Sequence, residues 1–536
     1  MTSANPHVLA VDLGTSGPKA AVVALDGSIV STARAHVETH YLPNHGVEQD
    51  PEAVWTACKE ACRGALSNST VRPADIAAVI SSSQYSSVVP VDADGNPTMN
   101  MILWLDQRGA HRRLKKFDAF PRRADGPLRM LSWLRRHGLP PVGGGSESLS
   151  HIRWVKYARP EVYKQTHAFL EPMDFLTMRF SGRCTANQCT AFMYLLTDNR
   201  SLGVTDYDPV LMGHSLIDRE KLPELVALDT VLGPIRPEIT QELGLSPSTQ
   251  IITGLNDTQS GGMGTYAFGG DHAAISVGST SVMITHVDFK RTNARHAILS
   301  MPSPVPGTYF VMAENGVGGG ALEYFLEHLI YAADEFGDLS HDNRFEALGR
   351  IVEAVEPGSG GVLFLPWMGG SIAPAADARM RGGFLNLSMK TRRGHLARAV
   401  LEGVAMNLAW LRNPVERFAK RRFSHFLYYG GGAESDAWSQ IMADVLDAPV
   451  HQLAQPKYTT CLGAALLAFE RLGLLDFGEF ASRVQVRRVY DPREEHRARY
   501  GELTEQFIAA FKKNRPIFRA LNGLKSKQFE PLIIQE

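Results

Sequence analysis

Two strand–turn–strand segments, about half the chain apart, constrain the fold more than any other feature of this sequence. In the first, the apolar runs Val8–Leu13 and Ala20–Leu25 flank the small, polar turn Gly14–Gly17. The second segment, Ala274–Ile284, repeats that order around the turn Gly278–Thr280. Short apolar runs joined by a glycine-containing turn predict β-hairpins. Their repetition predicts two duplicated domains whose turns face each other across a cleft.

The residues around the first turn have the chemistry of a phosphate site. Asp12 stands just before the turn, Lys19 just after it, and Thr15 and Ser16 supply hydroxyl groups within it. Glycine-rich backbone amides can bind phosphate oxygens, an ammonium group can neutralise transferred charge, and a carboxylate can hold Mg²⁺ through water. An ordinary glycine-rich hairpin fits the same residues, so both interpretations stay open at this point.

The length and composition are those of a globular protein with more than one domain. The chain has 536 residues, of which 44% are apolar and 21% are charged, so full cores are expected and disorder is not. The net charge of −1 provides no overall attraction to nucleic acid or to an anionic membrane. No apolar run approaches the roughly 18 residues that would span a bilayer.

The cysteines and the N-terminus predict a cytoplasmic protein. The five cysteines are odd in number and their spacing fits no zinc template, so we expect reduced thiols. The segment Met1–Pro6 has neither the charged nor the apolar region of a secretion signal. We therefore expect no nucleic-acid partner, no membrane partner and no secretion.

The prolines and glycines, which interrupt helices and strands, indicate where the domains divide. Leu232–Thr249 is rich in both residues and is the best candidate for a boundary. The sequence therefore predicts an N-terminal domain over residues 1–248 and a C-terminal domain over residues 249–485. Residues 486–536 are expected to form one amphipathic helix, near Glu494–Lys513, and a basic tail.

A single carboxylate stands near the predicted start of the second domain. A short apolar strand from Ile251 runs into a glycine turn, and Asp257 comes where the next helix would begin. A helix N-terminus keeps a carboxylate ionised, which suits a general base, but Asp is also an ordinary N-cap. The residues alone leave both roles open.

Polar groups also stand at the end of a predicted strand in the first domain. Met101–Leu105 would deliver Trp104, Asp106 and Arg108 to its end, where they could contact a substrate. The following residues 108–136 carry ten Arg or Lys. Because no aromatic interleaving or RNA-binding module accompanies them, we favour a solvated helical insertion over a nucleic-acid patch. Its apolar residues are expected to pack inward: Leu128, Leu131, Trp133 and Leu134.

Two further glycine-rich turns follow apolar strands in the second half. Gly316–Ala321 is similar to a dinucleotide fingerprint, but no second strand with an acidic end follows at the required spacing. The strand Phe426–Tyr429 leads into Gly430–Ser435, where Ser435 is placed to cap a helix over Asp436–Leu446. A glycine-rich turn that opens a helix lets a flat nucleotide approach the backbone closely.

Together and in this order, the motifs resemble the FGGY carbohydrate kinases, in particular their xylulokinase-like branch. The resemblance extends over residues 8 to 475. It implies an α/β fold of two ribonuclease-H-like domains of the actin and hexokinase superfamily, with sugar and ATP meeting in the cleft between them. The matching pieces are Asp12–Gly17, Trp104–Arg108, Gly254–Gly264, Gly278–Thr280, Leu365–Gly370 and Gly430–Ser435.

The resemblance also implies a role for individual residues. The chain would be an ATP- and Mg²⁺-dependent kinase that transfers the γ-phosphoryl group to a hydroxyl of a small sugar, ketose or polyol. Asp257 would be the catalytic base, and Asp12 would be the carboxylate associated with the metal. The acceptor would contact Gln84, Tyr85, Trp104, Asp106, Arg108 and Asp257. ATP would contact Thr15, Ser16, Lys19, Gly278, Ser279, Thr280, Gly318, Gly431, Gly432, Ala433 and Ser435.

The departures from the family pattern concern the acceptor. Tyr85 and Ser86 stand where xylulokinases have Met and His, and Ser371 and Ile372 stand where the family usually has Glu and Arg. The exact acceptor therefore stays open. Two alternatives also stay open: a catalytically silent binding or regulatory protein on the same fold, and a dinucleotide oxidoreductase that uses Gly316–Ala321. A homodimer is also compatible with the sequence.

Overall fold

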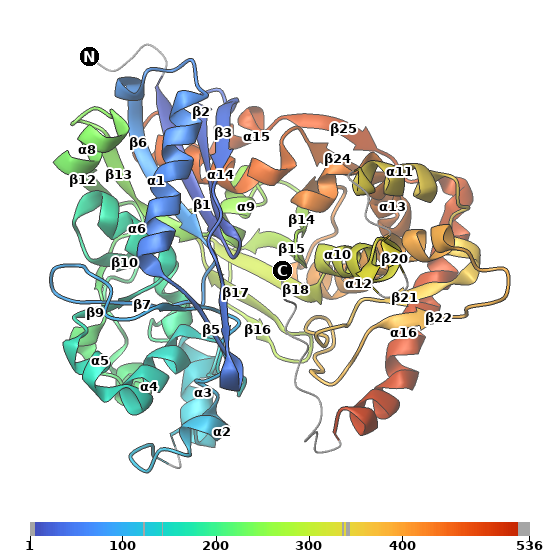
Figure 1. Cartoon of the computed structure of the whole chain (residues 1–536), viewed down its shortest axis with the longest axis horizontal. Helices are drawn as coiled ribbons and strands as arrows, with labels where there is room; N and C mark the ends of the chain where they lie inside the picture. The colour runs from blue at the N-terminus through green and yellow to red at the C-terminus, as the bar shows by residue number, and fades with distance from the viewer. Residues whose placement is uncertain (1–5, 122–123, 142, 335–336, 339–342, 524–536) are drawn as a thin grey trace.

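The structure, a computed structural model, describes residues 6–121, 124–141, 143–334, 337–338 and 343–523. It is an α/β fold built on two large mixed sheets, one from each half of the chain (Figure 1). Residues 1–5, two arginines of the predicted basic insertion (Arg122 and Arg123) and the predicted tail beyond residue 523 lie outside the described residues. None of the helices in the described part of the chain is both long and apolar enough to cross a membrane.

The first sheet is built from the N-terminal half and has six strands in the order β12-β13-β6-β1-β2-β3. β1, β2 and β3 form an antiparallel meander, whereas β6 pairs parallel with β1, and β13 pairs parallel with β6. The strands are β1 (His7–Gly14), β2 (Gly17–Ala24), β3 (Ile29–Arg34), β6 (Ile76–Ser83), β12 (Val231–Pro234) and β13 (Gln250–Asn256).

The second sheet repeats this arrangement. Its order is β16-β17-β18-β15-β14-β23-β24-β25, in which β14, β15 and β18 form an antiparallel meander and β23 and β24 continue from β14 in parallel. The predicted duplication is confirmed, because each hairpin lies at the same place in its own sheet. The strands are β14 (Ala273–Val277), β15 (Thr280–Val287), β16 (Thr292–Asn293), β17 (Ile298–Pro302), β18 (Tyr309–Val317), β23 (Phe426–Tyr429), β24 (Val450–Leu453) and β25 (Val486–Tyr490).

The helices that cover the first sheet come from both halves of the chain. α1 (Pro51–Ser67) packs its apolar side on one face of the sheet, and its first turn is capped by Asp50. α14 (Thr459–Arg471) shares a core with β1, β2, β6 and β13 on the opposite face, although it follows the second sheet in sequence. In Figure 1, α14 lies beside β1. The two halves are therefore joined by a continuous apolar core.

Long helices cover the second sheet. α12 (Arg393–Ala419) and α13 (Asp436–Leu446) contribute most of its apolar core, with Trp367 and Phe418 fully buried among them. α16 (Glu494–Leu521) packs on α12 and α13 and runs eight residues beyond the predicted end at Lys513. The amphipathic pattern of this segment therefore identifies the helix but not its length.

β13 lies within the first sheet, between β12 and β6. The sheet therefore extends past residue 248, where the sequence predicts the end of the first domain. The proline- and glycine-rich segment before β13 contains the short strand β12 and the helix α8 (Pro237–Leu243). These turns connect elements of one sheet, because glycine and proline mark a change of direction whether or not a domain ends there.

Two helices cross at glycines where the halves meet. A Cβ added to Gly463 of α14 would lie 1.9 Å from the carbonyl oxygen of Ser260 and 2.4 Å from the backbone nitrogen of Gly264. Both contacted residues belong to α9 (Asp257–Gly264). Only a residue without a side chain allows this approach, so Gly463 sets the distance between α14 and α9.

We expect Gly463→Ala to destabilise the protein by about 3 kcal/mol, the upper end of the range for overpacking, because the contacted atoms are backbone. Thermal unfolding monitored by circular dichroism measures this loss. Gly501→Ala is the matched control, since Gly501 lies within α16 and nothing lies within 4 Å of its added Cβ. That control should be neutral or slightly stabilising, because Ala has the higher helix propensity. Equal melting temperatures for the two variants would contradict the close crossing.

A helical lobe with its own apolar core extends the first domain below its sheet in Figure 1. In its basic part, α3 (Pro127–Arg136), Trp133 is fully buried, whereas Leu128 is 85% exposed and Leu131 is 62% exposed. The prediction that these leucines pack inward is wrong, because α3 turns only one narrow side toward the lobe. The lobe's helices include α2 (His111–Leu114), α4 (Ser148–Ala158), α5 (Pro160–Gln165) and α7 (Pro209–Ser215).

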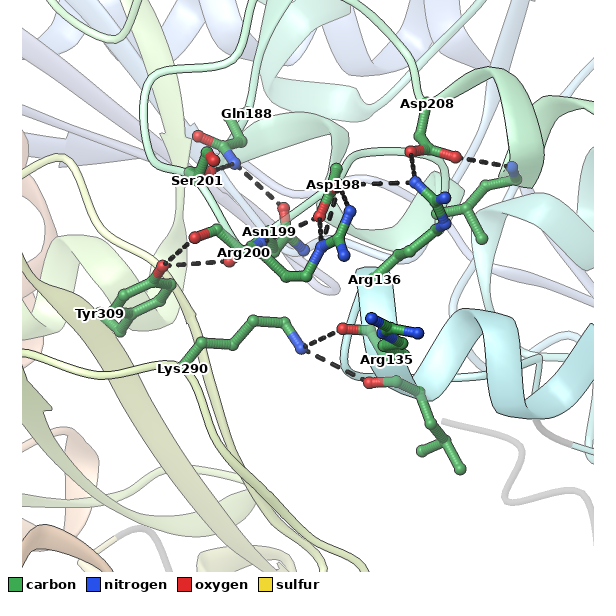
Figure 2. Close-up of polar contacts among 12 residues, drawn as sticks. Arg135, Arg136, Gln188, Asp198, Asn199, Arg200, Ser201, Asp208, Lys290 and Tyr309 are labelled. Carbon is green, nitrogen blue, oxygen red and sulfur yellow. Dashed lines mark hydrogen bonds and ion pairs between the residues drawn. The ribbon is translucent and has the colours of Figure 1, made fainter.

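The lobe also touches the second domain, through hydrogen bonds to backbone carbonyls (Figure 2). Lys290, which follows β15, donates from Nζ to the carbonyl oxygen of Arg135 at 3.2 Å. The hydroxyl of Tyr309, at the start of β18, donates to the carbonyl oxygen of Asn199 at 3.1 Å. The halves of the chain therefore meet at a second place, distinct from the crossing of α9 and α14.

Candidate active site

Asp12, at the end of β1, forms an ion pair with Lys19 of β2. The two residues are direct partners in the hairpin register, and Asp12 Oδ2 lies 3.0 Å from Lys19 Nζ. Asp12 also accepts hydrogen bonds from Thr460 Oγ1 at 2.7 Å and from Ser82 Oγ at 3.0 Å. Four elements, β1, β2, β6 and α14, thus hold one carboxylate in place.

Both members of this pair are charged at neutral pH. Burial raises the pKa of Asp12, but the Lys19 ammonium and the hydrogen bonds from Thr460 and Ser82 outweigh it and hold the pKa below its usual value. Burial lowers the pKa of Lys19, but the Asp12 carboxylate raises it to about 12. The first hairpin therefore presents a fixed positive charge beside a fixed negative one.

Asp257 is the first residue of α9, but it does not cap the helix. The N-cap is Asn256, whose side-chain oxygen accepts the backbone N–H of Gln259 at 2.8 Å. The interpretation of Asp257 as an ordinary N-cap is therefore wrong. Its half-buried carboxylate accepts the backbone N–H of Thr258 at 2.7 Å, which leaves most of its oxygen lone pairs unused.

Asp257 has an unusually high affinity for protons. Burial and the neighbouring charge of Asp12 raise the pKa of Asp257 to about 7, against the opposing effects of Thr258 and Lys19. A general base is most effective when its pKa lies near the working pH. Asp257 is therefore suited to take a proton from a hydroxyl group at neutral pH.

The second domain brings another half-buried carboxylate, Glu314 of β18, to the same place. The hydroxyl of Tyr85, which follows β6, lies 3.4 Å from the Sδ of Met312, and Met312 and Glu314 lie on one face of β18. Burial raises the pKa of Glu314 to about 7. Burial also raises the pKa of Tyr85, and the charges of Asp257 and Glu314 raise it further.

A small network links the predicted phosphate turn to the predicted acceptor residues. Gln84 Oε1 accepts hydrogen bonds from Thr15 Oγ1 at 2.6 Å and from Trp104 Nε1 at 3.1 Å. These two donors fix the orientation of the Gln84 amide. Its Nε2 is buried and has no hydrogen-bond partner among the described residues, which is unusual for a buried donor.

Asp106 and Arg108 are paired with protein groups. Asp106 is fully buried and accepts from the backbone N–H of Val47 at 2.9 Å and from Arg108 Nε at 2.8 Å. Arg108 also pairs with Glu48 at 2.6 Å, and its guanidinium lies 3.9 Å from the ring centroid of Trp154. β8 is shorter than predicted, covering Met101–Ile102, so both charges follow it in a loop. These contacts hold that loop; a contact with the acceptor stays a prediction.

The second hairpin is fastened to the start of α10 (Gly319–Phe325). The N–H groups of Gly318 and Gly319 donate to the carbonyl oxygens of Ser279 and Gly278 at 2.9 and 2.7 Å. Gly278 and Ser279 remain exposed, whereas Thr280 is half-buried. This geometry contradicts the dinucleotide interpretation of Gly316–Ala321, because β18 is antiparallel to both its neighbours and these amides already have partners.

The predicted nucleotide turn forms a short 3₁₀ segment, Gly431–Glu434, directly after β23. Gly431 is exposed, while Gly432 packs so closely on Tyr428 that an added Cβ would lie 2.6 Å from its hydroxyl oxygen. Ser435 caps α13 as predicted, since its Oγ accepts the backbone N–H of Trp438 at 3.2 Å. Because Gly431 is exposed and has no side chain, a flat ring system could approach the backbone here, next to the N-terminus of α13.

The sequence analysis missed three residues that the fold brings to this site. Ser82 and Thr460 donate hydrogen bonds to Asp12, and the charge of Glu314, from the other domain, acts on Asp257 and Tyr85. Glu314 is the only charged residue within β18, directly before a glycine-rich turn. That isolated carboxylate in an apolar strand was the available signal, whereas Ser82 and Thr460 are ordinary hydroxyl residues in sequence.

The comparison with known proteins agrees with this arrangement. The profile of the FGGY family of carbohydrate kinases, N-terminal domain, matches residues 7–264, and that of the C-terminal domain matches residues 273–470. A xylulose kinase of Staphylococcus epidermidis is 24% identical, over 95% of this chain and 97% of its own. A gluconokinase of Bacillus subtilis is 23% identical, over 94% of this chain and 95% of its own. The structure of gluconate kinase from Lactobacillus acidophilus matches with a TM-score of 0.81 and 22% identity, covering 97% of this chain and 100% of that one.

The fold and the site thus define a sugar kinase of the actin and hexokinase type, with a site built from both duplicated domains. The chain belongs to the FGGY family of carbohydrate kinases. Kinases of this family use ATP as the phosphate donor, and the chain is a phosphotransferase that acts on a sugar-type acceptor.

Proposed function

We propose that the chain transfers the γ-phosphoryl group of ATP to a hydroxyl of a small sugar, ketose or polyol. The observation that carries this proposal is the Asp257 carboxylate, which is half-buried, does not cap its helix and has a pKa raised to about 7. Asp257 would accept the proton of the attacking hydroxyl as the bond to phosphorus forms. Lys19 would neutralise charge on the transferred group.

Acceptor and nucleotide have different partners in this proposal. The free Nε2 of Gln84 would donate to an acceptor oxygen, with Tyr85 and Trp104 beside it. The turns of the two hairpins would bind the phosphates of ATP, through Thr15 and Ser16 in the first and through Gly278, Ser279 and Thr280 in the second, with Gly318 next to the second turn. The turn after β23 would bind the adenosine, through Gly431, Gly432, Ala433 and Ser435.

The residues present also fit Mg²⁺. Asp12 uses three hydrogen-bond or ion-pair contacts, so at least one of its about four lone pairs stays free. Mg²⁺ is usually held by one or two carboxylates, water and substrate phosphates, and no cluster of three candidate metal-binding side chains occurs within the described ranges. Asp12 would hold the ion through water, and the ion would supply charge neutralisation at the phosphates.

A panel of pentoses, ketoses and polyols, assayed for ADP release, tests the function. We expect steady turnover with at least one acceptor, and a phosphorylated product detected by mass spectrometry. ATP binding without turnover on any acceptor would favour the catalytically silent alternative. D-Xylulose belongs in the panel, because Ser86 and Ser371 predict that it is a poor acceptor.

We further propose a cytoplasmic location, supported by five cysteines that are all free thiols. A homodimer and the absence of a nucleic-acid partner stay predictions.

A further inference from the structure

One face of β18 is turned toward the first domain. A Cβ added to Gly262 of α9 would lie 2.9 Å from the Phe310 ring, and the Tyr85 hydroxyl lies 3.4 Å from Met312 Sδ. Alternate residues of a strand share a face, so Glu314 is the next side chain in the row Phe310, Met312, Glu314. This row extends from α9 to the loop after β6, where the proposed acceptor residues lie.

The Glu314 carboxylate is half-buried and has no partner. No hydrogen bond or ion pair to it is formed by any residue that the structure describes, whereas Asp12 has three such contacts. Its charge reaches the neighbouring groups, since it raises the pKa of both Asp257 and Tyr85. Its oxygens are therefore open to hydrogen bonds from a molecule bound beside Tyr85 and Asp257.

We propose that Glu314 contacts the acceptor directly and makes the enzyme select neutral polyhydroxy acceptors over acceptors that carry a carboxylate. This inference rests on the proposed kinase function and assigns its acceptor class. A sugar hydroxyl would donate to Glu314 and satisfy it. A carboxylated acceptor would instead bring a further negative charge to a site that already holds Asp12, Asp257 and Glu314.

The charges around Glu314 support this selection. The charge of Lys19 lowers the pKa of Asp257, but Lys19 is already paired with Asp12. Tyr85 is neutral, because its pKa is raised further above the usual range. Like charges brought together in a partly desolvated site repel strongly, so the site as built disfavours an anionic acceptor.

Matched acceptors that differ at one carbon test the inference. D-Glucitol and D-gluconate, or xylitol and D-xylonate, share a chain but carry either a hydroxymethyl or a carboxylate group. At a pH above 8, where Glu314 and Asp257 are ionised, we expect the wild type to favour the neutral member by at least about 100-fold in kcat/KM, and Glu314→Gln to reduce this preference at least tenfold. Glu314→Asp, which keeps the charge, should keep the preference and covers the case in which the Gln variant does not fold.

Glu353→Gln is the matched control, because Glu353 is exposed at the end of α11 (Arg344–Glu353), and it should leave the preference unchanged. A wild type that favours the aldonate, or a folded Glu314→Gln variant with unchanged preference, overturns the inference while leaving the kinase function standing. Turnover on no acceptor of either kind overturns the kinase function itself, and the inference with it.

Discussion

Asp257→Asn is expected to fold, to bind ATP and acceptor, and to lose at least about 100-fold in kcat. Asn keeps the shape of the side chain but cannot accept the proton of the attacking hydroxyl, and positioned general bases contribute about 10²–10⁴-fold. The helix cap is not affected, because Asn256 provides it. Steady-state ADP release, with binding measured by calorimetry, tests this expectation.

The pH dependence gives this prediction a second readout. Since the pKa of Asp257 is raised to about 7, kcat/KM of the wild type should rise with pH through about 7 as the carboxylate loses its proton. The Asn variant should lack this rise. Turnover within about threefold of the wild type, at an unchanged melting temperature, would contradict the assignment of Asp257 as the base.

The same substitution should increase stability at alkaline pH. A folded-state pKa above the unfolded value means that the native state holds the proton more tightly, so Asp257 lowers stability as pH rises from about 4 to above 7. Asp257→Asn should therefore raise the melting temperature at pH 8 more than at pH 5. Asp118→Asn is the control, because Asp118 is exposed in the helical lobe, and it should leave the pH dependence of the melting temperature unchanged.

Asp12→Asn is expected to reduce both stability and turnover. Removing one partner of a buried ion pair leaves the other charge uncompensated, which costs about 3–5 kcal/mol; the lower end applies because Lys19 is 31% exposed. Turnover should fall by at least about tenfold at fixed Mg²⁺, since losing a supporting carboxylate lowers metal affinity by about 10–100-fold. Thermal unfolding and Mg²⁺ titration of activity measure the two effects.

The stability loss in Asp12→Asn should depend on pH with a definite sign. The folded-state pKa of Asp12 is below its usual value, so its contribution is present at neutral pH and disappears as pH falls through that lowered value. The wild type and the variant should therefore differ at pH 7 and converge in acid. Asp118→Asn is the control, because Asp118 is exposed in the helical lobe; it should change stability by at most about 0.5 kcal/mol. An equal effect of both substitutions would contradict the role of the Asp12–Lys19 pair.

Local sequence determined the two hairpins and the duplication. In each hairpin, two apolar strands meet at a turn of small residues, and in the first hairpin this local chemistry fixes the register that pairs Asp12 with Lys19. The cap of α13 by Ser435 is likewise a local hydrogen bond, to the N–H three residues ahead. Such features depend on few residues and short loops, which is why they can be predicted.

The extent of the first domain was decided by the tertiary structure. α14 follows the second sheet in sequence but covers the first, because its apolar side fills the face opposite α1. β13 joins the first sheet by pairing with β6, which lies far from it in the chain. Long-range pairing of this kind leaves no local pattern beyond a buried strand or helix, so punctuation by Leu232–Thr249 could not locate the division.

The chemistry of the site also required the folded chain. Sequence placed Asp257 near a helix start, but only the backbone showed that Asn256 takes the cap and leaves the carboxylate free. Its raised pKa arises from burial and from Asp12 of β1, which lies in the same sheet as β13 but far from Asp257 in sequence. Glu314 reaches the same place because β18 lies against α9 and Tyr85. Charges that lie far apart in the sequence interact strongly only when packing brings them together and removes the water between them. At this site, Gly463 allows α14 to lie directly against α9, the helix that begins with Asp257.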